Sequence, residues 1–104
     1  MKISGYKEKM GGEWIEFQAT DIEELDDVSH WREDSIFLMA VPGPHVPIFE
    51  TYMENDWWLT FNQLKKKDAL KLAESLSQLS EANVLSEWIK FNLSEKTFLN
   101  ILGV

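Results

Sequence analysis

The chain has 104 residues, of which 44% are hydrophobic and 27% charged, and its formal net charge at pH 7 is −8. This length supports one hydrophobic core, so we expect a single domain over residues 1–104. The absence of cysteine excludes disulfides, thiolate metal sites and a cysteine nucleophile. We find neither the apolar segment of a signal peptide nor an apolar run of about 18 residues, and we therefore expect a cytoplasmic location.

The negative charge is concentrated in the first half of the chain. Residues 8–56 contain thirteen acidic and two basic residues, whereas residues 57–104 contain five acidic and six basic ones. Nucleic acids and anionic membranes are polyanions, so this field disfavours direct binding to either. The charge instead favours a protein partner with a basic surface, or serves solubility alone.

The first 34 residues predict a hairpin followed by an acidic connection. Residues 2–9 indicate a weak strand, the two glycines at 11–12 a turn, and residues 13–18 a strand with alternating hydrophobicity. Ile15 and Phe17 lie on one face of that strand, and Trp14, Glu16 and Gln18 on the other. In residues 20–34 the apolar positions 22, 25 and 28 have helical spacing, which predicts a short helix with its acidic side chains in water.

Residues 35–61 predict a three-stranded antiparallel meander. The run at 35–41 is continuously apolar, as in a central strand covered on both faces. Residues 46–53 follow a proline-rich turn and form the expected return strand, and residues 57–61 form the third. Adjacent strand residues point to opposite faces, so we expect Trp57, Leu59 and Phe61 in the core and Trp58 on the other face.

Beyond residue 61 the hydrophobic period becomes helical. The first expected helix begins near Lys66 and carries Ala69, Leu72, Ala73, Leu76 and Leu79 on one face. Ser80 is the expected cap of a second helix that buries Val84, Leu85, Trp88 and Ile89. Ser94 is the expected cap of a third, which carries Phe98, Leu99, Ile101 and Leu102. The predicted fold is therefore α+β, with an antiparallel sheet of four to five strands (a hairpin plus a three-stranded meander) followed by two to three C-terminal helices packed on one face.

No pattern in the sequence predicts catalysis or a bound cofactor. The two histidines, His30 and His45, occur in no serine–histidine–aspartate order, and a Gly-x-Ser-x-Gly nucleophile motif is absent. Neither a zinc nor a calcium ligand spacing is present, and the pair Gly11–Gly12 lacks the residues that cradle a phosphate. A loose helix-turn-helix likeness at residues 84–103 offers Lys96 as the only base of its second helix. We therefore expect no enzyme activity, metal, cofactor or direct nucleic-acid contact.

Aromatic and acidic side chains are predicted to share one surface. An aromatic and acidic sheet face is typical of a surface that binds a basic protein. The alternative is that residues 20–34 fold back and cover the tryptophans, which are highly buried on average. The expected protein-binding residues are Trp14, Glu16, Glu23, Glu24, Asp26, Asp27, Trp31, Glu50 and Trp58.

These features favour a small acidic protein-binding module that inhibits or neutralises another macromolecule by covering its basic site. In general character (small, acidic, cysteine-free, α+β and without catalytic motifs) the chain resembles bacterial immunity proteins and phage-encoded inhibitors of host defences, without sharing a specific motif with them. The alternative function is that of a structural or assembly protein that self-associates through the aromatic face.

Overall fold

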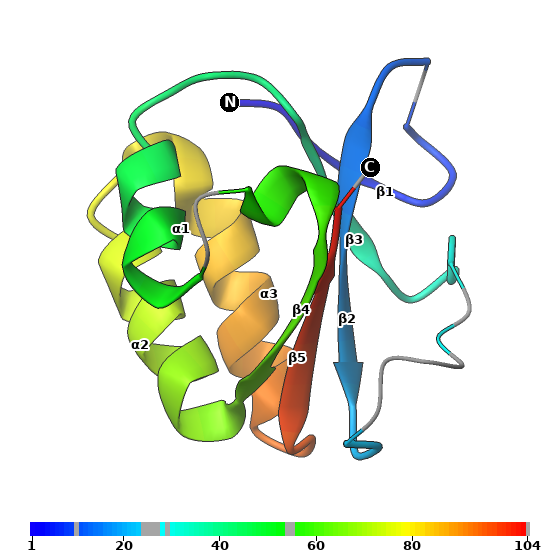
Figure 1. The fold of residues 1–104 in the computed structure, drawn as a ribbon, viewed down its shortest axis with the longest axis vertical. Coiled ribbons are helices and arrows are strands. Elements are labelled where there is room, and N and C mark those ends of the chain that lie inside the picture. Colours follow the sequence, from blue (N-terminus) through cyan, green and yellow to red (C-terminus); the bar gives the residue numbers. More distant parts are fainter. Residues whose placement is uncertain (10, 24–27, 29, 54–55, 104) are drawn as a thin grey trace.

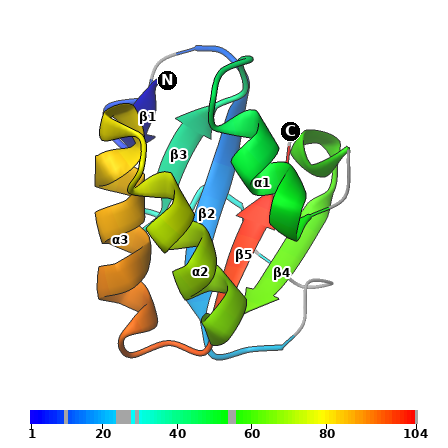
Figure 2. The same cartoon turned by 90° about the vertical axis from the view of Figure 1, so that its left-hand side faces the viewer.

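The computed structural model describes residues 1–9, 11–23, 28, 30–53 and 56–103. Its elements form two layers, with a five-stranded sheet on one side and three helices packed against one of its faces (Figures 1 and 2). The fold is therefore α+β, as the sequence predicts. No helix in the described part of the chain is long and apolar enough to cross a membrane.

The sheet contains β1 (Ile3–Gly5), β2 (Trp14–Thr20), β3 (Ile36–Met39), β4 (Phe61–Lys65) and β5 (Phe98–Leu102), in the spatial order β1-β3-β2-β5-β4. All neighbouring strands are antiparallel. Strand β2 lies at the centre between β3 and β5, so both of its edges are paired by backbone hydrogen bonds. Strands β1 and β4 form the two edges of the sheet.

The helical layer contains α1 (Val46–Tyr52), α2 (Lys66–Leu76) and α3 (Asn83–Leu93), with short 3₁₀ turns η1 (Trp57–Leu59) and η2 (Ser80–Ala82). The expected helical face is confirmed in α2, where Ala69, Leu72, Ala73 and Leu76 are all buried. Helices α2 and α3 approach closely where the Ser86 hydroxyl donates to the Ala73 carbonyl over 2.6 Å. In α3, Leu85 and Ile89 are buried and Trp88 partly so, but Val84 is exposed. Small side chains at this crossing allow the two helices to pack over the sheet.

The predicted hairpin and meander are wrong in their pairing. Strand β1 pairs with β3 rather than with β2, and β2 pairs with β3 and β5. Residues 46–53, expected as a strand, contain α1 instead. Pro47 occupies the first turn of that helix, where a missing N–H removes no hydrogen bond and the fixed φ suits the helix. The short helix predicted within residues 20–34 falls mostly on positions outside the described residues.

The 57–61 strand is also wrong, and so is the third C-terminal helix. Trp57 is buried as expected, but residues 57–59 form a 3₁₀ turn, in which side chains do not alternate between two faces. Leu59 is therefore 68% exposed. Phe61, the first residue of the edge strand β4, is 45% exposed. Residues 98–102 form β5, all five of them buried, in the interior of the sheet. A short segment with four apolar residues out of five fits a buried strand as well as a short helix, and here pairing with both β2 and β4 favours the strand.

The core lies between the helices and the inner face of the sheet. Ile15 and Phe17 of β2 are fully buried there, as the alternation predicts. Phe49 of α1 stacks on Trp57 with ring centroids 4.5 Å apart, and Trp57 stacks on Trp58 at 5.3 Å. The two adjacent tryptophans therefore pack against each other on the helical side of the sheet, and only Trp57 is fully buried.

Candidate functional site

The face of the sheet turned away from the helices carries a buried carboxylate. Glu16 projects from β2 between Phe37 of β3 and Leu102 of β5, its cross-strand neighbours. Its side chain is only 1% exposed. An ionised carboxylate is very costly to bury unless other groups donate hydrogen bonds to it, so the surroundings of Glu16 define the structure of this face.

Four groups donate hydrogen bonds to Glu16. The Ser35 hydroxyl and the Gln18 amide donate to Oε2 over 2.6 and 2.9 Å. The backbone N–H groups of Trp31 and Arg32 donate to Oε1 and Oε2 over 2.8 and 2.9 Å. Consecutive backbone N–H groups that converge on one anion form a nest. Glu16 therefore fixes the chain at residues 31–35 against the outer face of the sheet.

Trp31 adopts a backbone conformation that tryptophan rarely takes. Its φ is 62°, in the left-handed region, which disfavours a residue with a Cβ by roughly 1–2 kcal/mol. The nest around Glu16 holds this conformation, and the indole stacks on Phe37 with centroids 5.4 Å apart. The Lys9 ammonium lies 4.4 Å from the centroid of the same indole. Strain of this kind persists only where the surroundings impose it, and it is frequent at functional sites.

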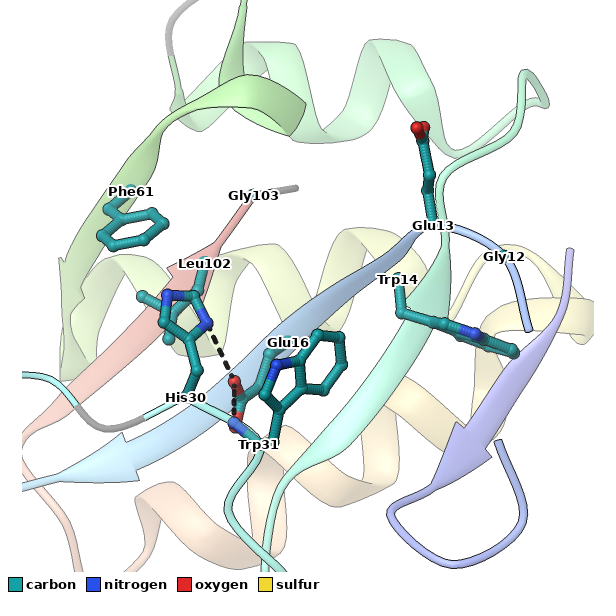
Figure 3. Close-up of a pocket in the computed structure, with 9 residues that line it drawn as sticks. All are labelled: Gly12, Glu13, Trp14, Glu16, His30, Trp31, Phe61, Leu102 and Gly103. Carbon is teal, nitrogen blue, oxygen red and sulfur yellow. Dashed lines mark hydrogen bonds and ion pairs between the residues drawn. The ribbon is translucent and has the colours of Figure 1, made fainter. Parts of the chain in front are cut away.

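An open groove of about 530 Å³ lies beside Trp31 on this face. Its described lining contains three aromatic rings, one imidazole, two carboxylates, a leucine and two glycines, namely Gly12, Glu13, Trp14, Glu16, His30, Trp31, Phe61, Leu102 and Gly103. Figure 3 shows the rings of Phe61 and His30 on one side, those of Trp31 and Trp14 on the other, and Glu13 at the rim. No lysine or arginine belongs to this lining. We call this feature the outer groove.

The imidazole of His30 connects the buried carboxylate with the groove wall. Its Nδ1 lies 3.5 Å from Glu16 Oε1, and its ring centroid lies 4.9 Å from that of Phe61 (Figure 3). The donors around Glu16 use its lone pairs, and the residue is almost completely covered. The carboxylate therefore acts as a structural anchor, and Glu13, which is exposed, is the carboxylate that a ligand in the groove would meet.

A row of amide side chains supports the same face next to Glu16. Gln63, Asn100 and Gln18 are cross-strand neighbours on β4, β5 and β2. Gln63 Nε2 donates to Asn100 Oδ1 over 2.8 Å and to the Ile22 carbonyl over 2.9 Å. At the end of β2, Asp21 accepts hydrogen bonds from the backbone N–H and hydroxyl of Thr97. The Thr97 hydroxyl, assisted by the charge of Lys96, lowers the pKa of Asp21. These contacts fix both ends of residues 21–35 to the sheet.

The predicted binding residues do not form one surface. Trp14, Glu16 and Trp31 come together at the outer groove, whereas Glu50 is exposed on α1 in the helical layer. Trp58 lines a separate hollow of about 270 Å³ with Leu59, Ala40, Pro42 and Glu13. Glu23 is exposed beyond the end of β2. Glu24, Asp26 and Asp27 lie outside the described residues.

The predicted exposure of this face is wrong for its two central residues. Trp14 is 3% exposed and Glu16 1%. Trp31 and Arg32 of the 20–34 segment cover Glu16, whereas the alternative drawn from the sequence expected this segment to cover the tryptophans. Sequence reasoning also missed Phe61, Leu102 and Gly103, which reach the groove through the pairing of β5 with β2 and β4. It missed His30 as well, which precedes Trp31 in the connection between β2 and β3. A glutamate in a half-apolar strand, followed by an acidic connection that contains a single tryptophan, is the local signal for this anchor.

A second histidine is buried in the helical layer. The side chain of His45, next to α1, packs edge-on against Phe49, and its Nδ1 has no hydrogen-bond partner within the described chain. Burial lowers the pKa of His45, and the positive N-terminus adds to the effect. Among the described residues, no group of three or more histidine, aspartate or glutamate side chains could hold a metal ion.

Comparisons with protein-family models, with curated proteins and with solved structures found no match.

Proposed function

We propose that this chain is a small acidic protein-binding module that inhibits or neutralises a basic macromolecule in the cytoplasm by covering its basic site. The observation that carries the proposal is the outer groove, which combines three aromatic rings and two carboxylates with no lysine or arginine. Buried aromatic anchors inside a polar rim provide most of the energy of protein interfaces. The proposal involves no catalytic step, metal or cofactor.

The charge of the chain supports a protein partner over a nucleic acid or membrane. The net charge of −8 repels polyanions and attracts a basic surface, which speeds association and makes it dependent on salt. Glu13, which lines the groove, is exposed, and so are Glu23, Glu33 and Asp34 of the connection that carries Trp31. These described acidic residues are accessible to a basic partner.

The experiment is an affinity capture from lysate at low salt, followed by association kinetics with each purified basic protein that is captured. Reversing Glu13 and Glu23 to lysine should slow association severalfold and weaken its salt dependence. The same reversal of Glu23, Glu24, Asp26 and Asp27 tests the acidic segment by itself. Reversal of Glu87, which is exposed on α3 in the opposite layer, is the matched control. Equal association rates for wild type and both sets of reversals would contradict a role for the acidic surface.

Self-association remains the second candidate, and one observation favours it. On α3, Phe91 is 80% exposed, and Val84, two helical turns earlier on the same face, is 64% exposed. The helix therefore presents apolar side chains to solvent. If the chain assembles through this surface, Phe91→Ser should lower the mass measured by light scattering. A concentration-independent monomer would exclude this function.

A further inference from the structure

We infer that the outer groove receives an arginine side chain of the basic partner, with Glu13 as its counter-charge and the rings of Trp31 and Phe61 as its walls. This inference rests on the proposed function and specifies the chemical group that the partner presents. The charge of the groove, the chemistry of its walls, its size and its rigidity all favour this ligand.

The charge of the groove favours a cation. Its described lining contains the carboxylates of Glu13 and Glu16 and no lysine or arginine. Glu16 is satisfied by its own donors, so its charge contributes a field without offering a contact. Glu13 is exposed, and Figure 3 shows it at the rim of the groove. An entering cation would therefore be attracted by the field of these two carboxylates.

The walls of the groove suit a flat cation. A cation within about 6 Å of an aromatic centroid is attracted by the electrons of the ring. Lys9 Nζ lies 4.4 Å from the Trp31 centroid and 5.4 Å from that of Phe37, so this cluster binds a cation within the chain. A ligand cation must therefore stack on the part of the Trp31 indole that is exposed to solvent and must tolerate the nearby charge of Lys9. A guanidinium is planar and weakly hydrated, and it stacks on aromatic faces more readily than an ammonium does.

The size and rigidity of the groove support the same ligand. Its volume of about 530 Å³ lies within the usual range of ligand sites and exceeds what one side chain needs, leaving room for flanking residues of the partner. The nest around Glu16 fixes Trp31 before binding. Less conformational entropy is therefore lost when the partner binds.

The test is a titration of the ¹⁵N-labelled chain with N-acetyl-arginine amide, followed by NMR. The lysine and citrulline analogues serve as probes. Lysine keeps the positive charge but lacks the planar end group of arginine, and citrulline keeps a planar end group but lacks the positive charge. Arginine should shift the indole N–H signal of Trp31 and the backbone signals of Glu13 and Phe61. Lysine should bind about threefold more weakly, and citrulline should cause no saturable shift. Saturation by citrulline like that by arginine, or equal affinity for lysine, would overturn the inference.

Two variants locate the binding. Glu13→Gln removes the rim charge at an exposed position, and Phe61→Leu removes a ring while keeping an apolar side chain; each should weaken arginine binding about threefold. Glu87→Gln on α3 is the control and should leave the titration unchanged. Unchanged affinity in both groove variants would overturn the inference.

The outcomes also separate this inference from the proposed function. If arginine shifts no groove signal while a basic protein still binds wild type and loses affinity on acidic reversal, the inference fails and the proposed function stands. If arginine binds as described but no basic protein binds the chain, the groove assignment stands and the proposed function fails.

Discussion

The backbone N–H of Trp31 donates a 2.8 Å hydrogen bond to the buried carboxylate of Glu16, and this contact joins the centre of the sheet to the wall of the groove. Glu16 belongs to the central strand β2, so its position is fixed by pairing on both sides. Trp31 has an unfavourable φ of 62°. The relationship explains how a loop residue acquires a fixed orientation.

Replacing Glu16 should therefore destabilise the whole chain. In Glu16→Leu, the backbone N–H groups of Trp31 and Arg32 and the Ser35 hydroxyl lose their acceptor, and we expect a loss of about 2–4 kcal/mol of unfolding free energy. Urea unfolding followed by circular dichroism measures this quantity. Glu23→Leu, at an exposed position on the same side, should change stability by about 0.5 kcal/mol or less. Equal stabilities for the two variants would contradict the anchoring role of Glu16.

Gly103 should tolerate no side chain. A Cβ at this position would lie 2.5 Å from the Trp58 carbonyl oxygen and 2.7 Å from that of Thr60, both backbone atoms that cannot move aside. We expect Gly103→Ala to destabilise the chain by about 1–3 kcal/mol through overpacking. Gly11, where a Cβ would meet nothing within 4 Å, is the matched control. If thermal unfolding shows the same midpoint for both alanine variants, the close approach of β5 to η1 is wrong.

His45 should make stability depend on pH in the weakly acidic range. Burial holds its folded pKa below the ordinary value of about 6.5. Above that pH, His45 is neutral in both the folded and the unfolded chain, so it does not lower the free energy of unfolding. As the pH falls towards the folded pKa, the unfolded chain binds a proton more readily, and unfolding becomes easier.

The measurement is urea unfolding at about pH 7.5 and about pH 5.5, on either side of the ordinary histidine pKa. The wild type should lose more stability between the two conditions than His45→Leu, which has no proton to bind and removes a buried nitrogen that lacks a partner. An identical loss in the two chains would show that His45 does not contribute to the pH dependence.

Local patterns in the sequence predict β2, β3 and α2. Alternation places Ile15 and Phe17 in the core, and the 3.6-residue period buries Leu72 and Leu76. The predictions for these segments are correct because the apolar face that each sequence pattern indicates is buried against other elements of the fold. The coarse α+β class follows from them.

The segments at 46–52 and 98–102 could not be assigned from such patterns. Both are short and mainly apolar, and over so few residues strand and helix periods are indistinguishable. Long-range pairing decides for β5, and packing of Phe49 on Trp57 accompanies the helix in α1. The candidate site depends on the same long-range contacts, since Phe61 and Gly103 reach Trp31 only through the order of the strands. The sequence therefore predicts part of the groove, and the topology completes it.

The most direct test of the account is a quantitative comparison of two matched double variants in partner capture. Glu13→Lys with Phe61→Ser changes the outer groove, and Glu87→Lys with Phe91→Ser makes the same chemical changes on exposed residues of α3. Circular dichroism first establishes that both variants are folded. The account predicts that a basic protein captured by the wild type is lost from the groove variant and retained by the α3 variant. Retention by the groove variant and loss from the α3 variant would contradict it.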